Sequence, residues 1–509
     1  MLIYILIIVI IIFYIYSKNY MYWSIRNVKH DIPVPLFGNR LTKIIKMQTS
    51  TELYRNIYTK YPSEKFVGHY RGSSPELIIR DPEIVKHILN RDFLNFYVRH
   101  QCDPKYEPLM KNLFVINGNS WKLLRQSLTS VFTGSKLRNI FPFLLNCAER
   151  MQNVGSALAN SGEVVDAYIL IEKFIVEFIE VFAFGIELDT TNHVHSLFLK
   201  LGKKIFHRSK LQTFLKTIEE IFPGFGYFYI SYKVNDVVRE SIVQIRRNIR
   251  MQRELKSGIR NDFMDLLTEM EKLGKISGDA FINKSEDVAP KIAELEIDEL
   301  CIAAQVYIFF AAGYETSTTA TSYTLHLLAY HPEVQRKVQN EIDRVLLKYD
   351  KLCYGAISEL IYLKQTVKES LRILPPGGYV SRVCTKEYTL PGTDVTIDPG
   401  VKIIIPIQAF HMDEKYYDNP DEFKPERFES DAVKQRHNYV YLPFGDGPRK
   451  CIAARLALMQ SMAAITALLQ KFSVKPAPTS IRNPRIKRTS YVVQSIEGGL
   501  PLILTPRNL

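Results

Sequence analysis

The sequence lacks any arrangement of cysteines that would indicate a disulfide framework or a zinc site. Its 509 residues include only six cysteines, which lie far apart, and no two of them form a CxxC pair or a Cys/His zinc spacing. A reducing compartment is the simplest inference from this usage. The six are Cys102, Cys147, Cys301, Cys353, Cys384 and Cys451.

Motifs that bind nucleotides and nucleic acids are also missing. The chain has neither a dinucleotide-binding fingerprint nor a flavin domain, so NADPH is not expected to bind it directly. Its 66 Lys and Arg residues against 53 Asp and Glu give a formal net charge of +13. No Lys/Arg-rich run carries interleaved aromatics, so we expect no nucleic acid, and the basic excess suits an acidic partner or an anionic membrane surface.

Charged side chains are absent from residues 1–17, MLIYILIIVIIIFYIYS. Such a run, followed by two tyrosines and Trp23, is typical of a membrane span and its interface. No small-residue cleavage site follows, and three basic residues precede the first acidic one, Asp31. We expect residues 1–23 to form a single signal-anchor with the bulk of the chain on the cytosolic side. An interfacial or cleaved segment remains the alternative.

No internal repeat, low-complexity tract or obvious interdomain linker divides the remaining chain. Residues 24–40 contain prolines and a glycine and are expected to form a stiff linker behind the anchor. Helical periodicity dominates from about 105 to 345, whereas 388–405 holds three short β runs between turn signals. We therefore expect residues 41–509 to form one large α+β domain, mainly α with a smaller β portion.

Three local patterns make more detailed structural predictions. Residues 65–89 indicate two β runs around a Gly-Ser-Ser-Pro turn, followed by a helix that opens at Asp81. Residues 273–293 are polar and irregular, which favours a surface loop. A helix is predicted from near Asp298 to Ala329, about 32 residues or roughly 48 Å, long enough to cross the domain.

Polar residues interrupt the middle of that long helix at AAGYETST, residues 311–318. A glycine inside a helix costs about 1 kcal/mol of helix stability relative to alanine, so packing or function must compensate for it. Two explanations are possible. One is close packing at Gly313, with the hydroxyls bonded back to the preceding turn. The other is a widened groove beside a cofactor, with Glu315 and Thr316 supplying protons and hydrogen bonds.

Two further pairs share helix faces. Glu369 and Arg372 are three residues apart, and Trp121 and Arg125 are four apart. At an exposed surface, each pair would be an ordinary surface interaction with no functional meaning. If Arg427, in the Pro-rich stretch NPDEFKPERF, joins Glu369 and Arg372, the three form a charge-assisted lattice that clamps an irregular segment.

A lone cysteine stands in the stretch FGDGPRKCIAAR, residues 444–455. Two glycines, a proline and two cations precede Cys451, and an alanine-rich helical sequence follows it. Taken alone, the stretch also fits a buried, inert core cysteine. The other motifs favour a functional thiol.

In their order along the chain, these stretches resemble the cytochrome P-450 superfamily of haem-thiolate monooxygenases, and the resemblance covers essentially the whole sequence. Further stretches look most like insect microsomal members of the clan that includes vertebrate drug-metabolising enzymes. In the haem-binding pattern FxxGxRxCxG, Ala453 stands where the family usually has glycine. The motifs are WxxxR at Trp121 and Arg125, [AG]Gx[DE]T[TS] at 312–317, ExxR at Glu369 and Arg372, PERF at 425–428, and the haem-binding pattern at Phe444, Gly447, Arg449 and Cys451.

The resemblance implies roles for individual residues. Cys451 would be the axial thiolate ligand of haem iron, a strong donor that favours O–O cleavage. Gly313 would leave room for O₂, Thr316 would hydrogen-bond the bound oxygen, and Glu315 would help to deliver protons. The remaining haem contacts would come from Trp121, Arg125, Arg382 and Arg449 at the propionates and from Phe444 in the cysteine loop.

The resemblance also implies the partners. Electrons from NADPH would arrive through a separate flavoprotein reductase, with cytochrome b5 as an optional second donor, at the endoplasmic reticulum membrane. The substrate would be a lipophilic small molecule, a xenobiotic or an endogenous lipid. A reductase-independent haem-thiolate isomerase or dehydratase, and a non-catalytic haem- or lipid-binding protein, remain as alternatives. Substrate contacts are expected from Phe114, Val115, Tyr307, Phe310, Ala311, Gly378, Tyr379 and Ile496.

Overall fold

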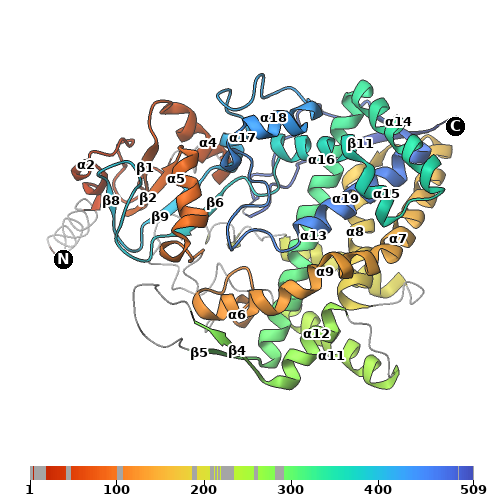
Figure 1. Cartoon of the computed structure of the whole chain (residues 1–509), viewed down its shortest axis with the longest axis horizontal. Helices are drawn as coiled ribbons and strands as arrows, with labels where there is room; N and C mark the ends of the chain where they lie inside the picture. Colours follow the sequence, from red (N-terminus) through yellow and green to blue (C-terminus); the bar gives the residue numbers. More distant parts are fainter. Residues whose placement is uncertain are drawn as a thin grey trace.

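A large helical region lies beside a smaller sheet region in the computed structural model of the chain (Figure 1). This arrangement confirms the predicted fold class, mainly α with a smaller β portion. The structure describes residues 4, 19–41, 48–99, 107–185, 192–206, 211, 212, 215, 218, 234, 236–256, 262–280, 292–490 and 492–507.

The main sheet has four strands in the order β1-β2-β9-β6. Strands β1 (Phe66–Arg71) and β2 (Ser74–Ile79) form the predicted hairpin, and Asp81 caps α5 (Pro82–Lys86) by accepting the Glu83 N–H at 2.8 Å. Strand β9 (Lys402–Ile405) pairs parallel to β2 and antiparallel to β6 (Val380–Val383). The sheet therefore joins segments more than 300 residues apart in sequence.

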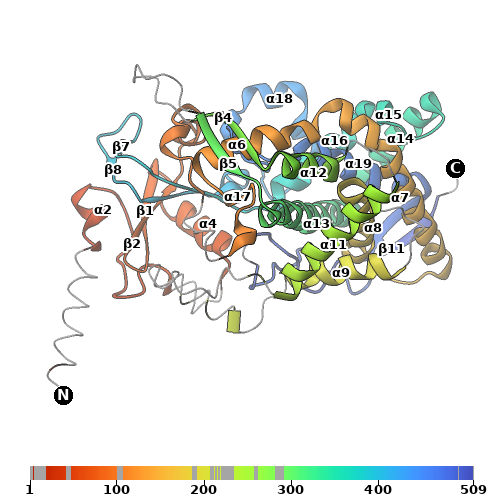
Figure 2. The same cartoon turned by 90° about the horizontal axis from the view of Figure 1, so that it is seen from below.

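Helix α13 (Glu299–Tyr330) is the predicted long helix, and its 32 residues run through the middle of the molecule in both views (Figures 1 and 2). Asp298 caps it by accepting the Cys301 N–H at 2.6 Å. Its neighbours include α8 (Ala167–Phe184), α16 (Ile361–Ile373) and α19 (Ala454–Lys471), and with them it forms the main hydrophobic core. The middle of α13 therefore lies among other helices of the protein.

The other elements surround these. Predicted strands at 388–405 are confirmed as β7, β8 and β9. The remaining helices are α2 (Tyr22–Ile25), α4 (Ser50–Lys60), α6 (Gly118–Thr129), α7 (Gly134–Ser161), α9 (Asn192–Phe206), α11 (Asp236–Lys256), α12 (Phe263–Leu273), α14 (Pro332–Tyr349), α15 (Tyr354–Glu359), α17 (Ile407–His411) and α18 (Ser430–Gln435). Short helical turns are η1 (His87–Arg91), η2 (Phe93–Asn95), η3 (Pro108–Met110), η4 (Ser130–Phe132), η6 (Pro425–Phe428) and η7 (Asn438–Val440). The remaining strands are β3 (Val165–Asp166), β7 (Tyr388–Thr389), β8 (Thr396–Ile397), β10 (Phe472–Pro476) and β11 (Pro501–Pro506).

The predicted surface loop at 273–293 is wrong in its described part. Strands β4 (Lys275–Asp279) and β5 (Ile292–Glu296) pair antiparallel there and pack against α6. Exposed and half-buried residues alternate along both strands and none is buried, so KISGD and IAELE lack the strong apolar alternation that would have predicted strands. Cross-strand pairing forms the hairpin, including an ion pair of 3.0 Å between Lys275 and Glu294.

The N-terminal segment joins the sheet region. Trp23, predicted at a membrane interface, is instead fully buried, and its indole N–H donates to the His69 carbonyl at 3.1 Å. Within the linker predicted at 24–40, isolated bridges join His30 to Gly68 and Gly38 to Arg71. None of the helices within the described ranges combines the length and apolar character of a membrane span. Apart from residues 4 and 19–23, the anchor predicted at 1–23 lies outside the described residues.

Candidate active site

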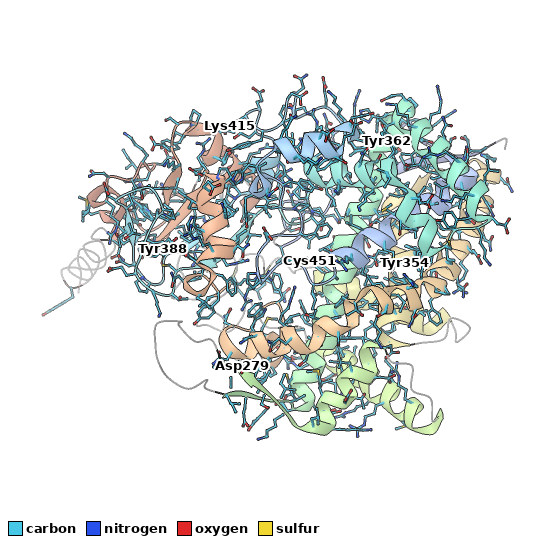
Figure 3. The ribbon with its side chains drawn as sticks, in the orientation of Figure 1. Asp279, Tyr354, Tyr362, Tyr388, Lys415 and Cys451 are labelled. Carbon is cyan, nitrogen blue, oxygen red and sulfur yellow. The ribbon has the colours of Figure 1, made fainter. Side chains whose placement is uncertain are left out.

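The loop before α19 places Cys451 near the centre of the molecule (Figure 3). The Cys451 N–H donates to the Phe444 carbonyl at 2.9 Å, which closes the loop. Gly447 has φ +71°, and a Cβ there would lie 1.8 Å from the Leu89 carbonyl oxygen. Only glycine fits this close approach to η1, so the local sequence fixes the position of the thiol.

The Cys451 side chain is exposed although protein surrounds the loop. Burial raises the pKa of its thiol, and a hydrogen bond from the backbone of Ala453 and the charges of Arg99 and Arg125 oppose this. The sulfur is therefore accessible from a space beside the loop, where a bound metal would displace the thiol proton. Ala453 has φ −99°, a conformation open to any residue, so its backbone does not require the glycine usual in the family.

Four arginines gather around this space without a carboxylate partner among the described residues. Arg382 and Arg449 are 1% and 2% exposed, and the Nε atoms of both have no hydrogen-bond acceptor. Burial and the neighbouring arginines lower the pKa of Arg449 to about 8 and that of Arg382 well below its usual value. Burial also lowers the pKa of Arg99 to about 10, and that of Arg125. The cluster requires an anion, and two carboxylates such as the haem propionates fit it.

Helix α6 contributes the predicted Trp121 and Arg125. The Arg449 guanidinium lies 4.5 Å from the centre of the Trp121 ring, and its Nη2 donates to the Ile116 carbonyl at 2.7 Å. Trp121, Arg125, Arg382, Arg449 and Cys451 therefore converge as expected. Sequence reasoning missed Arg99, because it stands in an irregular stretch that carries no motif. Its Nη2 donates to the Arg449 carbonyl.

An accessible stripe runs along the middle of α13. Ala312 is exposed and Thr316, one turn later, is half-buried, whereas Phe310, Ala311 and every residue from 317 to 329 are buried. The Thr316 hydroxyl donates to the Ala312 carbonyl at 2.5 Å. The neighbouring elements therefore leave this part of α13 uncovered, and the Thr316 hydroxyl is accessible there.

Close packing accounts for most of the other polar residues of this stretch. A Cβ at Gly313 would lie 3.2 Å from Ile179 Cδ1 of α8, so this glycine permits close helix contact. The Thr318 hydroxyl donates to the Tyr314 carbonyl at 2.7 Å, and Thr321 shares a hydrogen bond of 2.8 Å with Ser461 of α19. The packing interpretation of Gly313 thus has direct support, and its role in leaving room for O₂ stays a prediction.

Glu315 is buried beside Thr316 and makes two hydrogen bonds that the sequence did not predict. Its carboxylate accepts the Tyr168 hydroxyl at 2.7 Å and the Ser495 hydroxyl at 2.6 Å. These donors come from α8 and from the C-terminal part of the chain. Both are distant in sequence, so no local pattern could have identified them.

The predicted charged lattice forms around Glu369. Its two oxygens accept Arg372 Nε at 2.7 Å and Nη2 at 2.8 Å, and Arg427 Nε approaches at 3.3 Å. Arg372 also donates to the carbonyls of His411 at 2.8 Å and Pro420 at 2.7 Å. The three charged residues therefore clamp the irregular segment that leads to the cysteine loop.

The structure bears on three of the eight predicted substrate contacts. Phe310 is fully buried against Phe198, with ring centres 5.5 Å apart, and a Cβ at Gly378 would overlap Thr51. Neither of these two offers surface to a ligand in this structure, because tertiary packing occupies both. The Phe114 ring lies 4.8 Å from the Arg99 guanidinium, at the arginine cluster. Val115, Tyr307, Ala311, Tyr379 and Ile496 remain predictions.

A sequence model of the cytochrome P450 family matches residues 29–501. The chain belongs to the cytochrome P450 family. This P450 is 32% identical to cytochrome P450 6B2 of Helicoverpa armigera over 507 residues, 98% of this chain and 97% of that one. It is 33% identical to cytochrome P450 6a2 of Drosophila melanogaster over 493 residues, 95% of each chain. Cytochrome P450 6k1 of Blattella germanica is 31% identical over 496 residues, 96% of this chain and 93% of that one.

Family membership makes this chain a P450 monooxygenase with a haem-thiolate centre. Within the described residues, no group of three or more His, Cys, Asp and Glu side chains could hold a metal ion. A haem, whose porphyrin supplies most of the iron ligands and which takes an axial ligand from the protein, fits Cys451 and the arginine cluster.

Proposed function

We propose that this P450 inserts one oxygen atom from O₂ into a lipophilic small molecule, either a xenobiotic or an endogenous lipid or terpenoid. The observation that carries the proposal is the accessible Cys451 thiol beside four arginines that have no carboxylate partner among the described residues. When bound, haem supplies the iron centre at which O₂ is reduced, and the Cys451 thiolate supplies electron density that favours O–O cleavage.

The protein's own side chains would bind, orient and supply protons. Arg382 and Arg449 would regain favourable charge interactions by pairing with propionates. The Thr316 hydroxyl lies on the accessible stripe and could exchange the Ala312 carbonyl for an acceptor beside the haem. Glu315, the next residue, would receive protons through the hydroxyls that donate to it.

Electrons would come from NADPH through a separate flavoprotein reductase, with cytochrome b5 as an optional second donor. The test is NADPH oxidation by the purified protein with and without reductase in air-saturated buffer. We expect oxidation that requires both reductase and O₂. Turnover of a peroxide substrate without reductase would instead indicate an isomerase or dehydratase, and no turnover under any condition would indicate a binding protein.

Membrane attachment through residues 1–23 at the endoplasmic reticulum, with the catalytic domain in the cytosol, belongs to the same proposal. Apolar side chains are exposed where the described chain begins, including Met21, Ile25 and Ile32 at 54%, 71% and 91%. Deleting residues 1–18 keeps the buried Trp23 and should release the protein from carbonate-washed microsomes. Retention of the shortened chain would contradict the anchor.

The substrate class is best found by binding spectra. Apolar linings discriminate against ions better than among hydrophobic molecules, so several classes must be compared. Purified protein titrated with fatty acids, terpenoids, plant phenolics and insecticides should show a spin-state change with at least one class. Binding confined to polar or charged compounds would contradict the lipophilic assignment.

A further inference from the structure

The Glu315 carboxylate is held between two hydroxyls from separate parts of the chain. Tyr168 donates to one oxygen at 2.7 Å and Ser495 to the other at 2.6 Å. Glu315 is 3% exposed, and no lysine, arginine or histidine of the described ranges pairs with it. A buried carboxylate is costly without compensating hydrogen bonds, so these two donors determine where it can lie.

Tyr168 belongs to a rigid connection between α8 and α13. Tyr168 and Glu172 lie one turn apart on α8, and Tyr314 and Glu315 are adjacent on α13. The Tyr314 hydroxyl donates to Glu172, so the two helices exchange two tyrosine–glutamate hydrogen bonds. Burial and the nearby carboxylates raise the pKa of both tyrosines, so both hydroxyls remain donors. Tyr168 therefore ties one Glu315 oxygen to a fixed helix.

Ser495 belongs to a loop that touches the predicted substrate region. Its neighbour Gln494 donates from the backbone to the Pro376 carbonyl and from the side chain to the Pro375 carbonyl, each at 2.8 Å. The other neighbour, Ile496, is a predicted substrate contact and bridges to Ile486. A bound molecule that displaced this loop would have to break these bonds, and it would then move the hydroxyl that holds the second Glu315 oxygen.

We propose that Tyr168 and Ser495 are positioning residues for Glu315, and that Ser495 makes the position of its carboxylate respond to substrate. Tyr168 holds one oxygen from helix α8, and Ser495 holds the other from the loop that contains the predicted substrate contact Ile496. This inference rests on the proposed function, in which Glu315 delivers protons beside Thr316. The inference adds the residues that position the Glu315 carboxylate and a route by which substrate binding affects that carboxylate.

The test uses the full-length haem protein with reductase and 7-ethoxycoumarin as the probe. Ser495→Ala and Tyr168→Phe are compared singly and in combination with Glu315→Gln, and product formed per NADPH is measured. Each single variant should lower this ratio about threefold to tenfold. Neither should lower it further in the Glu315→Gln background, because both act through that carboxylate. Full additivity of the losses would overturn the proposal.

Two matched variants separate positioning from general loosening of the helices. Tyr314→Phe removes the other tyrosine–glutamate bond between α8 and α13, and Ser461→Ala removes a serine hydrogen bond to Thr321 of α13. Neither side-chain hydroxyl hydrogen-bonds to Glu315, so we expect the product ratio to stay within twofold of wild type. Losses equal to those of Ser495→Ala and Tyr168→Phe would contradict a specific role.

A readout besides activity tests the response to substrate. Hydrogen exchange of a peptide covering 311–318 should change when 7-ethoxycoumarin binds to wild type, and that change should be lost in Ser495→Ala at an unchanged dissociation constant. Persistence of the change would overturn the link through Ser495.

If Glu315→Gln keeps the wild-type product ratio, the proton role in the proposed function fails, and this inference with it. If Glu315→Gln lowers the ratio but Ser495→Ala and Tyr168→Phe do not, only the inference fails.

Discussion

Thr316 differs from Thr318 in its exposure and not in its hydrogen bond. Thr316 and Thr318 both donate to the carbonyl four residues earlier, at 2.5 and 2.7 Å. Thr318 is fully buried, whereas Thr316 is half-buried and lies with Ala312 on the accessible stripe. The hydrogen bond to the preceding turn is therefore ordinary for a threonine in a helix. Its accessibility is what makes Thr316, and not Thr318, a candidate for a catalytic role.

Thr316→Ala should keep haem, substrate affinity and much of the NADPH consumption, while hydrogen peroxide replaces product. Loss of one positioned hydrogen bond should lower product formation by more than tenfold, because each factor of ten in rate corresponds to about 1.4 kcal/mol. Product and peroxide per NADPH are measured with the same reductase. Thr318→Ala, which removes an equivalent back-bond at a buried position, is the control. An unchanged ratio in Thr316→Ala would remove this residue from the mechanism.

Helices α16 and α17 are joined by a lattice that includes one neutral histidine. His411 Nε2 accepts the Leu442 N–H at 2.9 Å, so Nδ1 carries the proton and donates to the Arg372 carbonyl at 3.1 Å. Burial and the Arg372 charge lower the pKa of His411 to about 3. The lattice that supports the cysteine loop therefore depends on an uncharged imidazole.

Stability should fall as pH decreases below about 6.5, the ordinary pKa of histidine. Between that value and about 3 the unfolded chain binds a proton at His411 that the folded protein does not, which costs up to about 1.4 kcal/mol per pH unit. His411→Asn should flatten the dependence of the thermal midpoint on pH between 7.5 and 5. An identical slope in variant and wild type would contradict this account.

Three lysines of the molecule are candidates for the surface that docks the reductase, but their surroundings differ. Lys450 is exposed, next to Cys451. The Lys122 ammonium on α6 donates to the Asp279 carbonyl of β4 at 2.7 Å, so the hairpin absent from the sequence prediction binds it. Lys136 lies at the start of α7, and we expect Lys122, Lys136 and Lys450 to form a basic docking face for the reductase. Charges on such a face act mainly on association rates.

Lys450→Glu should slow the first electron transfer from the reductase severalfold at low salt, and Lys122→Glu should slow it less. The effect should shrink as salt shortens the Debye length to roughly 8 Å near physiological ionic strength. Stopped-flow reduction under carbon monoxide measures the rate, and substrate-binding spectra serve as the control. Equal rates for wild type and Lys450→Glu at low salt would refute the docking face.

Motifs with local spacing were predictable across the molecule, and contacts between distant segments were not. The α13 helix, its Asp298 cap and the Glu369–Arg372 pair follow from residues at most a few turns apart. Arg99 beside Arg449 and Ser495 beside Glu315 join positions 350 and 180 residues apart, with no periodicity to mark them. Trp23 was misplaced because an aromatic beside an apolar run resembles a membrane belt, whereas tertiary packing buries it.

The central claim is that Cys451 holds haem iron through its thiolate. The most direct measurement is the absorption spectrum of the dithionite-reduced protein with carbon monoxide, for wild type and Cys451→Ala, with Cys384→Ala as a matched buried cysteine. Wild type and Cys384→Ala should show the red-shifted Soret band that a thiolate ligand produces. Folded Cys451→Ala should lack it. A red-shifted band retained in Cys451→Ala, or absent from haem-loaded wild type, would contradict the account.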